Sequence, residues 1–284
     1  MVFFREYAPH PALQSFVRHY WILHVRLDAR TPREQLPIKP YPPGTEQCLY
    51  FYPFDLPYTV KSGNQVPESA TSGIVVGQPL SRLNITINTN YLMLKVSFQP
   101  GGLFRLLGVP MNLLVDSHAD LEAITGDVVS EVSERLPEAI DYVDMIQCVE
   151  QFLLRKAAHC RRLVLPIDRV AQQMLRPSSY HQLDRLAHDA CLSTRQFERK
   201  FRERVGVSPK LFTRIARFRH AYKLRENDPL RSWTDISYAC GYFDPTHLIK
   251  DFQQFAGTSP GQLFDEETVH QQSVAAYVRR GPRW

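Results

Sequence analysis

Apolar residues in the C-terminal half of the chain recur three and four positions apart, the spacing that places them on one face of an α-helix. Prolines interrupt this pattern, several of them directly after a serine or aspartate, and mark where one helix ends and the next begins. This half is therefore predicted to be all-α. The expected helices are Ile167–Leu175, Leu183–Ala190, Thr194–Val205, Pro209 to about Arg225, Trp233–Cys240, Pro245–Phe255 and Pro260–Asp265.

The same half contains an internal repeat, because the stretch Leu186–Pro209 is echoed about 50 residues later by Ile236–Pro260. Each copy has an apolar residue, a tight turn about five positions later, a capping residue and a second amphipathic helix. The second copy is one residue longer in its turn. This order is that of a helix-turn-helix, present twice. The matched pairs are Leu186 and Ile236, Cys191 and Gly241, Phe197 and Leu248, Phe201 and Phe252, Gly206 and Gly257, Ser208 and Ser259, and Pro209 and Pro260.

Local chemistry supports both turns. Ser193 can cap the first recognition helix, and Gln196 completes a capping-box pattern with it. Asp244 can cap the second, followed by Pro245 at the first helical position. The long helix that starts at Pro209 would span roughly 25 Å, which suits two reading helices in successive major grooves.

The N-terminal half has a different pattern, with short runs of β-branched and aromatic residues between Pro-rich and Gly-rich turns. Strands are expected at Phe16–Val25, Gln47–Tyr52, Ile74–Val76, Leu83–Ile87 and Tyr91–Phe98, in a small barrel or sandwich. Helices are expected after residue 102, at Leu103–Leu107, Asp116–Thr125, Asp127–Leu136 and Asp141–Lys156. The apolar stripe of the last helix is core, a dimer face, or a packing surface for the C-terminal half. The fold class is therefore α+β.

Charge divides the chain in the same place. Residues 1–160 carry 13 Lys and Arg against 16 Asp and Glu, whereas residues 161–284 carry 21 against 13. We expect three parts: residues 1–160, an N-terminal domain; residues 161–266, the tandem helix-turn-helix domain; and residues 267–284, a mobile basic tail. The basic excess indicates a phosphate-binding surface, although a solvated helix face has the same composition.

The exposed faces of the two reading helices supply the candidate DNA-binding residues. Arginine can donate two hydrogen bonds to guanine, and glutamate can accept from cytosine. The first helix is therefore expected to provide most base discrimination, and the second to contribute shape, methyl contacts and backbone contacts. For any single arginine, a phosphate contact is the equal alternative. The candidates are Thr194, Arg195, Glu198, Arg199 and Arg202 on the first helix, and Thr246, His247, Ile249 and Lys250 on the second.

Other kinds of site have little support. The five cysteines are scattered and never form C-x-x-C, which argues against a disulfide framework or a thiolate zinc site and for a reducing cytoplasm. His19 and His24 are five residues apart and lack the H-x-H-x₃₋₄-E framework of a metal site, so no metal and no cofactor are expected. No carboxylate pair with a companion base, G-x-S-x-G or P-loop indicates an enzyme. No signal peptide or membrane segment is apparent.

The C-terminal repeat resembles the DNA-binding domain of the AraC-type transcription regulators. The resemblance runs from about Pro166 to Phe264 and is most specific in Ile236–Pro260. Cys191 departs from the family pattern, which usually has Gly there, so some strain is expected in the first turn. Shorter motifs, such as Val96-Ser-Phe-Gln-Pro-Gly-Gly102, resemble one subgroup of AraC-type sensor domains. That resemblance implies an effector-binding or dimerisation module and names no ligand.

The leading hypothesis is a bacterial, cytoplasmic, sequence-specific transcription regulator. Its expected partners are double-stranded promoter DNA, RNA polymerase, a small-molecule effector and a second copy of the chain, with no membrane. Two alternatives stay open: a ligand-independent DNA binder whose N-terminal domain only dimerises, and a repair-type enzyme fused to a DNA-binding domain. The residues chosen as candidates for effector binding, each of which could instead be core or surface, are Trp21, Glu46, Tyr50 and Tyr52.

Overall fold

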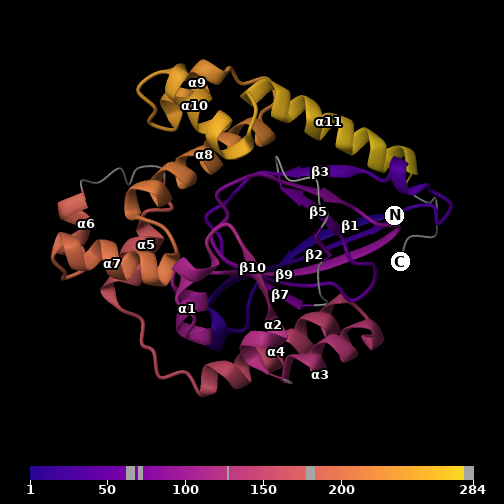
Figure 1. Cartoon of the computed structure of the whole chain (residues 1–284), viewed down its shortest axis with the longest axis horizontal. Coiled ribbons are helices and arrows are strands. Elements are labelled where there is room, and N and C mark those ends of the chain that lie inside the picture. Colours follow the sequence, from indigo (N-terminus) through magenta and orange to yellow (C-terminus); the bar gives the residue numbers. More distant parts are fainter. Residues whose placement is uncertain (62–67, 70–72, 127, 177–182, 278–284) are drawn as a thin grey trace.

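The computed structural model describes residues 1–61, 68–69, 73–126, 128–176 and 183–277. A β-rich N-terminal half occupies the centre of the molecule, with helices α1–α4 below it in Figure 1. The all-helical C-terminal half curves around the left and upper sides of these strands. The α+β architecture expected from the sequence is confirmed.

Two antiparallel sheets form the N-terminal half, as the barrel or sandwich prediction required. The larger sheet has the order β1-β2-β9-β4-β7-β10, and the smaller one β3-β8-β5-β6. The sequence pattern located β2, β4, β7, β8 and β9 but missed the other five. The strands are β1 (Val2–Tyr7), β2 (Val17–Arg26), β3 (Ile38–Tyr41), β4 (Cys48–Phe51), β5 (Tyr58–Lys61), β6 (Glu68–Ser69), β7 (Gly73–Val76), β8 (Leu83–Thr86), β9 (Asn90–Phe98) and β10 (His118–Asp120).

The central strands β4 and β9 of the larger sheet are buried on both faces, whereas the edge strand β1 is largely exposed. In β4, Leu49 and Phe51 belong to the core that packs against the helices, whereas Cys48 and Tyr50, with Tyr52 just after the strand, belong to a second apolar cluster. Successive side chains of a strand point to opposite faces, so alternation alone produces this division. The second face, with its tyrosines, is the one that borders the cavity described below.

Four α-helices complete the N-terminal half: α1 (Gly102–Leu107), α2 (Leu121–Thr125), α3 (Val128–Arg135) and α4 (Tyr142–Ala158). The apolar stripe of α4 is core, since Val149, Phe152 and Leu153 are fully buried. The prediction of a helix from Asp116 is wrong over its first residues. His118–Asp120 instead form β10, which pairs with β7, and Asp120 caps α2.

Seven helices of the C-terminal half are described, and the predicted positions are confirmed to within a few residues except at the last helix. They surround two apolar cores, one for each repeat, and α8 contributes Phe212 to the first and Phe218 to the second. The helices are α5 (Pro166–Gln173), α6 (Leu183–Asp189), α7 (Thr194–Val205), α8 (Pro209–Asn227), α9 (Trp233–Ala239), α10 (Pro245–Ala256) and α11 (Pro260–Tyr277).

The prediction that a mobile tail begins at residue 267 is wrong for residues 267–277, because α11 continues to Tyr277. This helix runs along the upper side of the molecule toward β3 (Figure 1), and Val274 packs against the apolar cluster of the N-terminal half. The sequence pattern did not predict this extension of α11 because Val274 packs against a distant part of the chain. Residues 278–284 lie outside the described residues. None of the described helices has the length and hydrophobicity needed to cross a membrane.

Candidate nucleic-acid interface and an adjoining cavity

The first helix-turn-helix consists of α6, a tight turn and α7. Ser193 caps α7 by accepting a hydrogen bond from the Gln196 N–H, and the Gln196 side chain accepts one from the Ser193 N–H, as the capping box predicts. Cys191 has a φ of +55°, in the left-handed region that favours glycine. The expected strain at this departure from the family pattern is therefore present.

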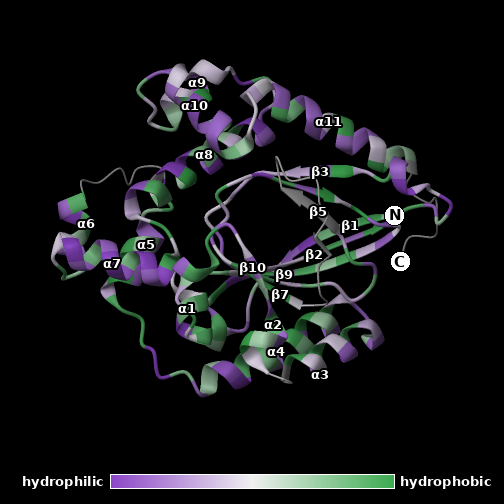
Figure 2. Ribbon diagram, viewed as in Figure 1, coloured by the Kyte–Doolittle hydropathy of each residue, from purple (hydrophilic) through white to green (hydrophobic). Residues whose placement is uncertain are grey.

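The predicted DNA-reading face of α7 is open to solvent. Arg195, Arg199 and Arg202 are exposed, and Glu198 is half-buried. Figure 2 shows α7 drawn largely in the hydrophilic colour. The Thr194 hydroxyl donates a 2.8 Å hydrogen bond to the Asp184 carboxylate and so ties α7 to α6. The structure thus brings the five predicted residues to one helix, while their contacts with bases stay predictions.

The second unit consists of α9, its turn and α10, which begins at the predicted cap. Asp244 accepts a 2.9 Å hydrogen bond from the His247 N–H, and its carboxylate lies 3.2 Å from the His247 ring nitrogen. Thr246, His247, Ile249 and Lys250 are all exposed. This face carries one lysine where α7 carries three arginines, and the predicted division of base reading between the two helices stays a prediction.

A buried carboxylate fixes α10 against the connecting helix α8. Asp251 of α10 is 3% exposed and accepts a 2.6 Å hydrogen bond from Arg214 of α8. It also accepts one from the Tyr242 hydroxyl at 3.1 Å, and Arg217 of α8 lies 3.6 Å away. Because α8 has 19 residues and a length of about 28 Å, it holds the two units at a set spacing.

A second buried pair fixes α7. Arg204 donates two hydrogen bonds to the Asp168 carboxylate of α5, at 2.7 and 2.6 Å, and both residues are buried. The Arg204 guanidinium also lies over the Phe104 ring of the N-terminal half, 4.9 Å from its centroid. This arginine belongs to the basic run of the sequence, but it serves packing and faces away from solvent.

The N-terminal half also contacts the end of α7 directly. Gln47, 3% exposed, donates hydrogen bonds to the carbonyl oxygens of Val205 at 2.9 Å and Arg204 at 3.4 Å. The last carbonyls of a helix have no partner within the helix. Gln47 therefore caps the first recognition helix from the other half of the chain.

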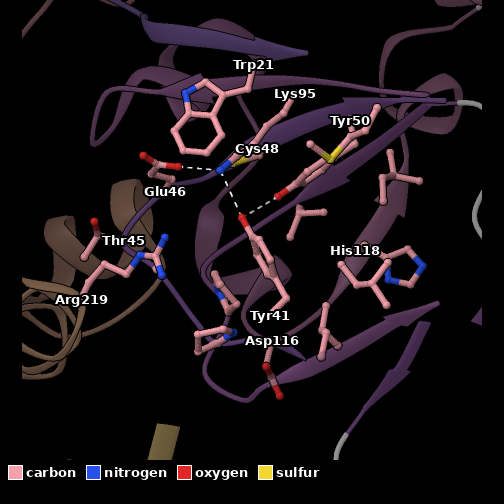
Figure 3. A pocket seen from close by; sticks show the side chains of 18 of the residues that line it. Trp21, Tyr41, Thr45, Glu46, Cys48, Tyr50, Lys95, Asp116, His118 and Arg219 are labelled. Atoms are coloured by element: carbon pink, nitrogen blue, oxygen red, sulfur yellow. Dashed lines mark hydrogen bonds and ion pairs between the residues drawn. The ribbon is translucent and has the colours of Figure 1, made fainter. Parts of the chain in front are cut away.

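A cavity of about 140 Å³ lies between the two sheets and α8 and opens to solvent. The four residues predicted to bind an effector, Trp21, Glu46, Tyr50 and Tyr52, all line it, and Figure 3 shows three of them from close by. Their role in binding stays a prediction. The remaining lining is Arg18, Tyr41, Pro42, Gly44, Thr45, Cys48, Ile74, Val76, Pro79, Ser81, Leu83, Ile85, Met93, Lys95, Asp116, Ser117, His118, Arg219 and Lys223.

Lys95 is the central charge of the cavity wall. Its ammonium group is 2.7 Å from the Glu46 carboxylate and 3.2 Å from the Tyr41 hydroxyl, as the dashed lines in Figure 3 show. Burial alone would raise the pKa of Glu46, but Lys95, with help from His19 and Arg18, lowers it to about 2. Burial would likewise lower the pKa of Lys95, and its anionic and phenolic neighbours raise it above its usual value. Both groups are therefore charged at neutral pH.

The mouth of the cavity is formed by both halves of the chain. Arg219 and Lys223, one helical turn apart on α8, face the cavity together with Arg18 of β2. Asp116 lies nearby, but its carboxylate already accepts hydrogen bonds from the Ser81 hydroxyl and from the N–H groups of Leu80 and Ser81. Four cationic side chains (Arg18, Lys95, Arg219 and Lys223) and two carboxylates (Glu46 and Asp116) thus line the cavity.

Comparison with known families gives two matches. Residues 186–266 match a model described as a helix-turn-helix domain, of the AraC type, and residues 5–120 match a domain of unknown function, DUF6597. The HTH-type transcriptional regulator GlxA of Rhizobium meliloti (strain 1021) is 32% identical over 101 residues, which are 36% of this chain and 30% of that protein. The chain therefore spans less than a third of the length of this relative.

The C-terminal half contains an AraC-type helix-turn-helix domain.

Two solved structures are similar in outline. An apo variant of ToxT from Vibrio cholerae strain SCE256 is 12% identical, with a TM-score of 0.48 over 86% of this chain and 97% of that one. The DNA-binding domain of AdpA, solved in complex with a target DNA, is 24% identical, with a TM-score of 0.35 over 38% of this chain and 96% of that one.

The residues that sequence reasoning assigned to DNA reading lie on largely exposed helix faces, and their role stays a prediction, but the sequence analysis missed most residues that join these helices to the N-terminal half. Lys95 left a signal, as the one charged residue in the apolar run Tyr91–Phe98. The sequence analysis did not assign Arg219 and Lys223 to the cavity, because they belong to the basic run of the domain, whose residues are ordinarily interpreted as phosphate contacts. Gln47 left no signal, because its partners are main-chain carbonyls far away in the sequence.

Proposed function

We propose that this protein is a sequence-specific DNA-binding transcription regulator whose promoter binding is controlled by a small molecule in the cavity. The AraC-type domain supports the first part of this proposal, because its two units present α7 and α10 with their N-terminal residues exposed. Residues at such positions contact base edges in the major groove. The connecting helix α8 suits two neighbouring groove segments of one duplex.

One observation carries the regulatory part. The cavity is lined by Trp21 and Tyr50 of the N-terminal half and by Arg219 and Lys223 of α8. A molecule bound there would contact both the sheet and the helix that sets the spacing of the two recognition helices. Its binding energy would therefore differ between arrangements of the two halves, which is the requirement for a ligand to shift such an equilibrium.

The cavity chemistry defines the class of effector. Aromatic and aliphatic side chains form most of its wall, which favours an apolar or aromatic body. Glu46 is paired with Lys95 and lies 3.8 Å from Arg18, while Arg219 and Lys223 of α8 line the same cavity. We infer an amphipathic molecule with an anionic group, such as a carboxylate, which arginine binds with two parallel hydrogen bonds.

The remaining parts of the proposal concern partners. A regulator of this kind acts in the cytoplasm, where it meets promoter DNA and RNA polymerase, and a second copy of the chain joins it on promoters that offer two sites.

The test begins with selection of binding sites from a random duplex library by the full chain. We expect an asymmetric motif of two short blocks, and an affinity that falls steeply with salt as counterions are released from the phosphates. Melting of the full chain is then measured against a panel of amphipathic carboxylates, since a true effector stabilises the folded state by mass action. No selected motif would overturn the DNA-binding role. No melting shift together with unchanged DNA affinity would favour a ligand-independent binder.

A further inference from the structure

The turn of the second helix-turn-helix has one residue more than the first, and that residue is Phe243. Both turns start with the same two backbone hydrogen bonds. In the first unit the cap, Ser193, then follows at once, whereas in the second Phe243 stands before the cap, Asp244. In the first turn, the Cys191 N–H donates to the His188 carbonyl and the Leu192 N–H to the Ala187 carbonyl. In the second turn, the Gly241 N–H donates to the Tyr238 carbonyl and the Tyr242 N–H to the Ser237 carbonyl.

The fold makes little use of the Phe243 side chain. A hydrophobic residue just before a helix cap often packs on the fourth residue of the helix, here Leu248. Leu248 is fully buried, yet Phe243 is 86% exposed, and Tyr242, 3% exposed, anchors the turn instead. The Phe243 ring makes an edge-to-face contact with the exposed His247 ring, at 6.2 Å between centroids.

The position of this ring is that of a DNA contact. It lies at the N-terminal end of α10, the part of a recognition helix that approaches base edges. Thr246 and Ile249 follow at intervals of three residues and are exposed too, with Lys250 beside them for the phosphate backbone. In Figure 1, α9 and α10 lie at the outer margin of the molecule, away from the sheets.

We propose that Phe243 reads thymine, by packing its ring against the C5-methyl group of a thymine in the major groove. Thymine is the base that presents an apolar group there, and an aromatic side chain can contact it. The inference rests on the proposed function and adds a base preference to the second unit. It also accounts for a difference between the units: α7 carries arginines suited to guanine, whereas the second unit exposes the apolar side chains of Phe243 and Ile249.

The test replaces each thymine of the selected site by uracil, which removes the methyl group and leaves base pairing intact. Affinities are measured for the full-length wild type, for Phe243→Ala and for a control, Phe4→Ala. Phe4 is 55% exposed on β1, far from the AraC-type domain in the sequence. We expect the wild type and the control to lose about fourfold in affinity at one thymine of the second block, the worth of one buried methyl group.

The variant Phe243→Ala should bind the thymine and uracil forms of that position equally, with about the affinity of the wild type for the uracil form. An unchanged uracil effect in Phe243→Ala would overturn the inference, as would a wild type that ignores every substitution in the second block. Normal DNA binding by Phe243→Ala with lost promoter activity would instead assign the ring to a protein partner. If the wild type selects no motif at all, the proposed function fails first.

Discussion

The side-chain amide of Gln47 donates a 2.9 Å hydrogen bond to the main-chain carbonyl oxygen of Val205. Gln47 directly follows Glu46 and precedes Cys48, two residues of the cavity wall, whereas Val205 ends the first recognition helix. One short segment of chain therefore borders the cavity with one set of side chains and caps α7 with another. A change at the cavity wall has a direct structural route to the DNA-reading helix.

Replacing Gln47 by leucine should remove this cap while keeping the volume of the side chain. The carbonyl oxygens of Val205 and Arg204 would then be buried without their donor, which costs about 1–3 kcal/mol of unfolding free energy. We expect faster amide hydrogen exchange at the end of α7 and a weakened effect of any effector on DNA affinity. Urea unfolding and hydrogen exchange measure both.

The matched control is Gln173→Leu, because Gln173 is exposed at the end of α5. It should leave stability and exchange near those of the wild type. Equal behaviour of the two variants would show that the Gln47 contact does not stabilise α7.

The sequence predicted the C-terminal helices well because each follows local rules. Ser193 and Asp244 occupy the N-cap positions of α7 and α10, which serine and aspartate favour. The apolar residues of each helix recur at helical spacing and pack into the small core of their own unit. The elements that the sequence analysis did not predict share one cause, because each depends on contacts with a distant part of the chain. Strand β10 forms because β7 pairs with it, and the last part of α11 rests against the N-terminal half.

Removing Asp168 should destabilise the first unit strongly. Asp168→Ala leaves the buried Arg204 guanidinium without its carboxylate, a change that costs about 3–5 kcal/mol in comparable buried pairs. Urea unfolding of the full chain measures this loss. The control is Glu131→Ala, which breaks the exposed pair with Arg155 and should cost at most about 1 kcal/mol. Similar losses in the two variants would contradict the structural role assigned to Arg204.

Arg199→Ala should weaken binding to the selected site by about 1–3 kcal/mol and relax one base preference in the first block. The exposed guanidinium can form two hydrogen bonds with a guanine, and alanine cannot replace them. Arg155→Ala, an exposed arginine of α4, serves as the control. A selected motif that is unchanged in Arg199→Ala would assign this residue to the phosphate backbone.

Acidification should loosen α11 from the N-terminal half. Burial, together with Lys39, lowers the pKa of His270 from its ordinary 6.5 to about 4, although a backbone hydrogen bond at Ile38 opposes this shift. The unfolded chain thus takes up a proton more readily than the folded one. The contribution of neutral His270 to the free energy of unfolding is complete above pH 6.5 and is lost as the pH falls from 6.5 to 4.

Hydrogen exchange of α11 across this pH range, corrected for intrinsic rates, measures the effect. The variant His270→Phe keeps a neutral ring and should lose the part of the pH dependence that His270 contributes, whereas the titration of Glu267 on the same helix, whose pKa burial raises, remains. A profile equal to that of the wild type would place the titrating group elsewhere.

The cavity shows how far side-chain chemistry alone can lead. Aromatic residues and one acid on early strands pointed to Trp21, Glu46, Tyr50 and Tyr52, and the structure gathers them around one space. Their alternation with core residues along β4 was readable from the sequence. The contribution of α8 was not, because it depends on how the two halves pack against each other.

The most direct test of the central claim, that one chain reads two neighbouring groove segments through α7 and α10, is an insertion of five base pairs between the two blocks of the selected site. This insertion turns the second block about half a helical turn away from the first, and α8 is too rigid to follow. We expect the affinity of the full chain to fall at least about tenfold, to the value for a site with a single block. An affinity unchanged by the insertion would show that only one unit reads the DNA, and would contradict the account.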